Sequence, residues 1–94
     1  MRHHFLVHNP GDHVGVAVDA IEAGQQVYGI VLADDSQTDA ITARGNVPLS
    51  HKIALRSLAA GERVIEYGLP VGVLKEAVTV GDYVHTHNMK TARW

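Results

Sequence analysis

Two short stretches of the chain hold most of the side chains that could do chemistry. Residues 50–52 read Ser-His-Lys, and residues 84–88 read Val-His-Thr-His-Asn. Imidazoles transfer protons near neutral pH and bind metal ions, while a lysine ammonium binds anions. The functional prediction depends on these stretches meeting in space, and we expect the fold to bring them together.

The histidines of the second stretch suggest a metal site. His85 and His87 are two residues apart on an expected strand, so they face the same side. With His51 as a third ligand they form a candidate site for a divalent metal. No HExxH-type spacing supports this site, and the alternative is that these are surface or hydrogen-bonded histidines.

The Ser-His-Lys stretch does not predict one catalytic unit, because adjacent residues on a strand point to opposite faces. No acid partner or nucleophile elbow surrounds Ser50, so His51 and Lys52 remain the candidate catalytic residues. Lys52 and Arg56 share a face if the strand continues, and together they could bind a substrate carboxylate. The alternative is that both are solvated charges at a strand edge.

Tyr67 offers an aromatic ring beside a turn. Tyr67-Gly68 followed by Pro70 is most simply a turn covered by an aromatic side chain. The functional alternative is a ring on which a ligand stacks, and Tyr67 is therefore a candidate substrate-binding residue.

The elements that position these groups read as strands, so we predict an all-β fold with one domain over residues 1–94. Short apolar or alternating runs predict the strands; they are residues 5–7, 14–18, 27–32, 53–55, 63–67, 71–74 and 81–85. Residues 19–24 are expected to form one helical turn, and residues 33–46 a polar surface loop.

A seven-residue motif recurs at residues 21–27, 58–64 and 78–84. Each copy has an apolar residue three before a glycine and a valine three after it. This pattern predicts a glycine turn with positive φ that leads into a strand. The irregular spacing excludes a solenoid and indicates a small domain with tight corners.

Composition excludes several classes of protein. The 94 residues contain no cysteine, which excludes disulfides and thiolate metal sites. No apolar run approaches the roughly 20 residues that span a bilayer, which excludes a transmembrane helix in this sequence. Residues 1–47 carry two basic and six acidic residues, and residues 48–94 carry six basic and four acidic residues. Neither half has the dense basic stripe that nucleic-acid binding requires. We expect a cytoplasmic protein whose mildly positive half favours a small anionic ligand, and whose modest core is compatible with a homo-oligomer.

Several blocks together resemble the SAF domain of the altronate/galactarate dehydratase family. They are His-Lys-Ile-Ala-Leu-Arg at 51–56, Ala-Gly-Glu at 60–62, Tyr-Gly at 67–68 and Val-His-Thr-His-Asn at 84–88. The stretch His-Asn-Pro-Gly-Asp-His-Val at 8–14 resembles the opening of that family, and the likeness runs from about residue 5 to 91. Three departures put the substrate in doubt: Ser50 for a usual glycine, Glu66 for a common lysine, and Leu69 for a usual glutamate.

The resemblance implies a β-clip fold and a role in β-elimination from a hydroxy acid. The expected reaction removes water from altronate or galactarate, or sulfite from sulfolactate. The resemblance implies that a large catalytic subunit takes part, and that some members use an iron-type divalent metal. The implied site residues are His51, Lys52, Tyr67, His85, His87 and Asn88, with Asn88 as a substrate-binding residue. We expect an accessory subunit with little turnover alone. The alternative is a freestanding module that binds small carboxylated or sulfonated ligands.

Overall fold

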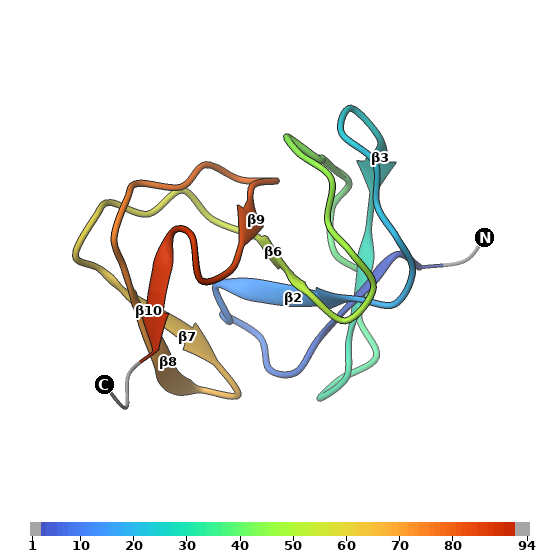
Figure 1. Ribbon diagram of the computed structural model, residues 1–94. Coiled ribbons are helices and arrows are strands. Elements are labelled where there is room, and N and C mark those ends of the chain that lie inside the picture. Colours follow the sequence, from blue (N-terminus) through green and yellow to red (C-terminus); the bar gives the residue numbers. More distant parts are fainter. Residues whose placement is uncertain (1–2, 92–94) are drawn as a thin grey trace.

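The computed structural model describes residues 3–91, which form ten short strands and no helix (Figure 1). The strands are β1 (Phe5–Val7), β2 (Val14–Ala17), β3 (Gln26–Val27), β4 (Gly29–Val31), β5 (Ile41–Thr42), β6 (Lys52–Ala54), β7 (Arg63–Glu66), β8 (Leu69–Leu74), β9 (Tyr83–Val84) and β10 (Met89–Thr91). The predicted all-β class is confirmed. Within this range no helix is long and apolar enough to cross a membrane.

The strands of residues 3–91 form three sheets. A five-stranded sheet has the order β4-β1-β2-β6-β9, a three-stranded sheet the order β10-β8-β7, and β3 pairs with β5. β1 and β4 run parallel, and the other pairs are antiparallel. Figure 1 shows the three-stranded sheet at one end of the molecule and β3 at the other, with β2 and β6 between them.

Two apolar cores lie on either side of β6. Ile53 is fully buried in the first core with Phe5 and Val27. Ala54 is fully buried in the second core, which includes Val64. Successive residues of a strand face opposite ways, so β6 sends odd-numbered side chains to one side and even-numbered ones to the other. This alternation decides which polar residues around β6 can meet.

The recurring glycine motif forms the same turn in all three copies. Its glycines, Gly24, Gly61 and Gly81, have φ of 86°, 87° and 93°, respectively. After the third glycine, Asp82 closes the turn by accepting a hydrogen bond from the Thr79 amide at 2.7 Å. Gln25 and Glu62 close the other two turns in the same way, and the valine that follows each turn is buried. The positive φ predicted from the motif is therefore confirmed.

Two predicted elements differ from the structure. The segment 19–24 is not helical, because Ile21 pairs with Val47 in an antiparallel bridge and its backbone is extended. The expected loop 33–46 contains β5, which pairs with β3, and it buries Ala43. Near its start, the Ser36 hydroxyl and amide donate hydrogen bonds to the Asp34 carboxylate and hold the pKa of that group below its ordinary value. The polar composition of residues 33–46 predicted a loop, but β5 within this segment is stabilised by pairing with β3 rather than by an apolar pattern of its own.

Candidate functional site

Three imidazole rings gather around Tyr83. The centroid of its ring lies 5.6 Å from that of His51, 5.7 Å from that of His85 and 5.3 Å from that of His87. The rings of His51 and His85 are 4.6 Å apart, and the Tyr83 hydroxyl lies 2.5 Å from Nδ1 of His51. The two stretches therefore meet, and we call these four residues the histidine–tyrosine cluster.

Strand pairing explains how this cluster forms. Tyr83 on β9 lies opposite Ile53 on β6, and its ring packs against the first core. His51 comes just before β6 and His85 just after β9, and the contacts of their rings with Tyr83 place both on the Tyr83 face. β9 ends at Val84, so the assumption of one strand through His85 and His87 is wrong. His87 instead reaches Tyr83 from a turn.

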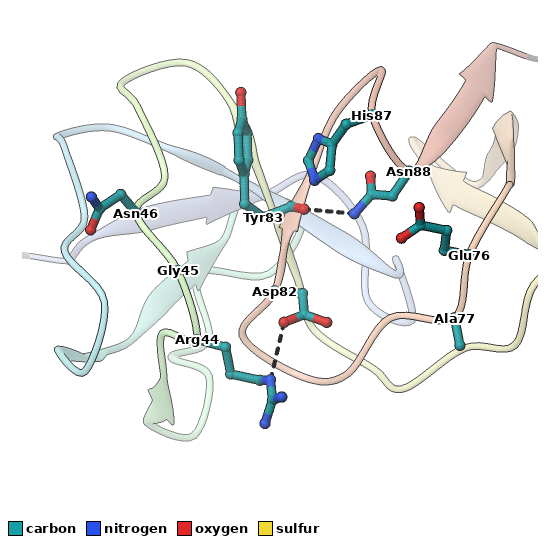
Figure 2. Close-up of a pocket in the computed structure, with 9 residues that line it drawn as sticks. All are labelled: Arg44, Gly45, Asn46, Glu76, Ala77, Asp82, Tyr83, His87 and Asn88. Carbon is teal, nitrogen blue, oxygen red and sulfur yellow. Dashed lines mark hydrogen bonds and ion pairs between the residues drawn. The ribbon is translucent and has the colours of Figure 1, made fainter.

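Asn88 holds this turn in place from within. It is 6% exposed, and its Nδ2 donates a hydrogen bond to the Tyr83 carbonyl at 2.8 Å (Figure 2). Its Oδ1 accepts a hydrogen bond from the His85 amide at 2.9 Å. Asn88 thus positions two members of the cluster through their backbone, and a direct contact between Asn88 and substrate remains a prediction.

A pocket of about 380 Å³ lies beside the cluster. Its lining residues are Arg44, Gly45, Asn46, Glu76, Ala77, Asp82, Tyr83, His87 and Asn88 (Figure 2). Arg44 Nε donates a hydrogen bond to Asp82 Oδ1 at 3.1 Å, so this cation is already paired. The remaining wall includes the Glu76 carboxylate and the His87 ring, which suits a small polar molecule with hydroxyl groups.

Lys52 belongs to a second cluster on the opposite side of β6. Its Nζ lies 3.7 Å from Oε1 of Glu66, a side chain that is 5% exposed. Nε2 of His8 lies 3.6 Å from Oε2 of the same carboxylate, and the His8 ring stacks on Tyr67 with centroids 3.7 Å apart. As the alternation along β6 requires, His51 and Lys52 do not act as one unit.

Tyr67 lies at the tip of the hairpin between β7 and β8. Tyr67 and Gly68 both have positive φ, at 58° and 70°, the pattern of a two-residue type I′ turn. The buried Asp12 carboxylate accepts hydrogen bonds from both backbone amides, at 3.0 and 3.2 Å. The Tyr67 side chain is therefore held on a rigid turn, where it is 55% exposed.

Ser50 adopts the left-handed conformation, with φ of 72°. Glycine takes this conformation without steric cost, which explains why a glycine suits this corner. The Ser50 amide donates to the Ala17 carbonyl at 2.8 Å, so the corner is tied to β2.

Arg56 does not join either cluster. β6 ends at Ala54, so the condition for Lys52 and Arg56 to share a strand face is not met. Arg56 is exposed, and within residues 3–91 it makes no hydrogen bond or ion pair. A substrate contact from Arg56 remains a prediction.

The metal hypothesis finds only partial support in the donor set. Among the described residues, no group of three His, Cys, Asp or Glu side chains is placed to hold one metal ion. His51 Nδ1 is occupied by Tyr83, and His87 contacts Tyr83 rather than the other imidazoles. The proposed set of His51, His85 and His87 does not form a three-ligand site by itself, so a metal here would need ligands from outside the described residues.

Comparison with known proteins identifies the family. Residues 3–92 match the altronate/galactarate dehydratase SAF domain. The chain belongs to this family. Its all-β architecture is that expected of the SAF β-clip.

Two relatives are small subunits. A protein of Chromohalobacter salexigens named (2R)-sulfolactate sulfo-lyase subunit alpha is 41% identical over 91 residues, which is 96% of each chain. The Paracoccus pantotrophus protein of the same name is 42% identical over 64 residues, 68% of this SAF chain and 96% of that relative. Altronate dehydratase of Escherichia coli is 39% identical over 80 residues, but the match covers 15% of its length.

Tyr83 and His8 are the candidate functional residues that sequence reasoning missed. Tyr83 was treated only as part of a strand, although its position two residues before His85 placed both on one face. His8 lies more than 40 residues from Lys52 and Glu66 in the sequence. The β1–β2–β6 order places it near Lys52, and the hydrogen bond from the His13 amide to the Ile65 carbonyl ties this part of the chain to β7, which carries Glu66.

Proposed function

We propose that this SAF chain is the small subunit of a dehydratase-type lyase and that it acts with a large catalytic subunit. The reaction is β-elimination from a sugar acid or related hydroxy acid. The observation that carries the proposal is the match over 96% of both chains to a relative named as the alpha subunit of a sulfo-lyase.

The position of the histidine–tyrosine cluster supports a shared site. His85 and His87 are exposed, and His51 is half-buried, so the cluster opens at the surface. An elimination proceeds best where water is excluded, and so small a domain offers no deep cleft of its own. The chain therefore presents His51 and His85 at the rim of a site that the larger subunit closes.

Within that site His51 is the candidate catalytic residue. β-Elimination takes a proton from one carbon and releases a leaving group from the next, and an imidazole can assist by transferring a proton or by donating a hydrogen bond to an oxygen that gains negative charge. Lys52 and Tyr67 belong to the second cluster, on the opposite side of β6 from His51, so their contact with a substrate carboxylate is a separate prediction. A divalent metal held with the partner subunit, a cytoplasmic location and self-association also remain predictions.

The test is reconstitution. The purified chain is assayed on altronate, galactarate and sulfolactate, alone and mixed with the large subunit encoded in the same organism. We expect turnover of one of these acids only in the mixture. Equal turnover by the chain alone would contradict the two-subunit proposal, and tight ligand binding without turnover in either sample would favour a freestanding binding module.

A further inference from the structure

The hydrogen bond between Tyr83 and His51 determines more than the packing of two rings. The hydroxyl of Tyr83 lies 2.5 Å from Nδ1 of His51, close enough for a direct hydrogen bond. A phenol is a good donor and, because its lone pair is conjugated with the ring, a poor acceptor. The favoured arrangement has the Tyr83 O–H donating to an unprotonated Nδ1.

A hydrogen bond at one ring nitrogen decides which nitrogen of a neutral imidazole carries the proton. We propose that Tyr83 is a positioning residue that holds neutral His51 as the Nε2–H tautomer. The Nε2–H group is then a hydrogen-bond donor on the far side of the ring from Tyr83. Tyr83 lies outside the His-Lys, Tyr-Gly and His-Thr-His-Asn blocks, so the family resemblance assigns it no role.

Tyr83 is held firmly enough for this role. Its backbone pairs with Ile53 across β6 and β9, and its carbonyl accepts from the buried Asn88. Its ring packs against the first core on one side and lies nearly parallel to the His85 ring, at 9°. The hydroxyl therefore has a fixed position before any ligand arrives, which is the condition for a preorganised hydrogen bond.

The consequence for chemistry depends on the proposed lyase function. An Nε2–H donor fits an anionic oxygen, either the substrate carboxylate or the oxygen of a departing group. The other tautomer would present a bare nitrogen lone pair there and would repel the same oxygen. Tyr83 thus decides whether His51 offers a donor or an acceptor to the substrate.

The direct test is nitrogen NMR of the full chain labelled with ¹⁵N-histidine, at mildly alkaline pH. The His51 signals are assigned by their loss in His51→Gln. In the wild type we expect the chemical shift of Nδ1 to be that of an unprotonated, pyridine-like nitrogen and the shift of Nε2 to be that of a protonated, pyrrole-like nitrogen. In Tyr83→Phe, both signals should move toward intermediate values as the tautomers mix.

The matched control is Tyr28→Phe. It removes a hydroxyl from a ring that packs against another histidine, His4, with the two ring centroids 5.4 Å apart. His51 signals should be unchanged in this variant. A wild-type His51 with the proton on Nδ1 would overturn the proposal even if Tyr83→Phe failed to fold. Identical His51 shifts in wild type and a folded Tyr83→Phe would overturn it as well.

Activity gives a second, separate readout. In the reconstituted enzyme, Tyr83→Phe should lower kcat about tenfold, equivalent to about 1.4 kcal/mol, with KM nearly unchanged. Wild-type kcat in Tyr83→Phe would overturn the claim that the tautomer matters for turnover. If no acid is turned over but the NMR result holds, the lyase proposal fails while the tautomer assignment stands.

Discussion

Gly81→Ala should destabilise the domain more than the same change in the two sister turns. Gly24, Gly61 and Gly81 have nearly equal φ, so each alanine pays the same backbone strain of about 1–2 kcal/mol. The surroundings differ. A Cβ on Gly24 or Gly61 would have no atom within 4 Å, whereas a Cβ on Gly81 would lie 2.1 Å from the Thr42 carbonyl oxygen.

That oxygen belongs to the backbone of β5 and cannot rotate away. Relieving the overlap would separate the Gly81 turn from the segment after β5, where the Arg44 amide donates to the Gly81 carbonyl at 2.9 Å. Overpacking of this kind costs about 1–3 kcal/mol. We expect Gly81→Ala to lose roughly 2–5 kcal/mol, against about 1–2 kcal/mol for Gly61→Ala.

The assay is urea unfolding followed by circular dichroism, with the midpoint and slope fitted for each variant. A domain of this length has a stability of roughly 5–14 kcal/mol, so a loss of about 2–5 kcal/mol appears either as a lower urea midpoint or, at the lower end of that stability range, as a variant that is unfolded without urea. The two controls share the turn and the substitution, which leaves the Thr42 contact as the difference. Equal losses in Gly81→Ala and Gly61→Ala would refute the reasoning from that contact.

Three further substitutions test the positioning contacts. Asn88→Ala leaves the His85 amide and the Tyr83 carbonyl without partners and should lower the free energy of unfolding in urea by about 2–4 kcal/mol. A loss below about 0.5 kcal/mol would contradict the role of Asn88 in holding the turn in place. Glu66→Gln removes the charge that faces Lys52 and should lower the free energy of unfolding by about 1–2 kcal/mol. This is less than for a fully buried pair because the lysine is partly exposed. Unchanged stability would mean that the ion pair makes no net contribution to stability. Ser50→Gly relieves positive φ and should raise stability by about 0.5–1 kcal/mol; a decrease would show that the serine side chain is needed.

The sequence predicted the fold class well because the informative residues are local. Valines after Gly24, Gly61 and Gly81 fix where strands begin, and the glycines fix where the chain turns. Both signals are read within seven residues. The strand β5 was missed because it is two residues long and gains its order from pairing with β3.

The candidate site could be predicted only in part. Alternation along a strand correctly separated His51 from Lys52, since the former contacts Tyr83 and the latter Glu66. Lys52 and Arg56 were expected to share a face only if the strand continued to Arg56, and that condition is not met because β6 ends at Ala54. The central position of Tyr83 depends on the β6–β9 register, and register is a long-range property that no local pattern encodes.

The order of strands also has a consequence for synthesis on the ribosome. β6 in the middle of the chain pairs with β9, and β8 pairs with β10, which ends at Thr91. The five-stranded sheet is complete only when β9, which ends at Val84, has emerged from the ribosome, and the three-stranded sheet only when β10 has emerged. Four strands of the five-stranded sheet precede residue 55 and can pair earlier, but both larger sheets require late strands, so this domain is expected to complete its fold only after translation of its last strand.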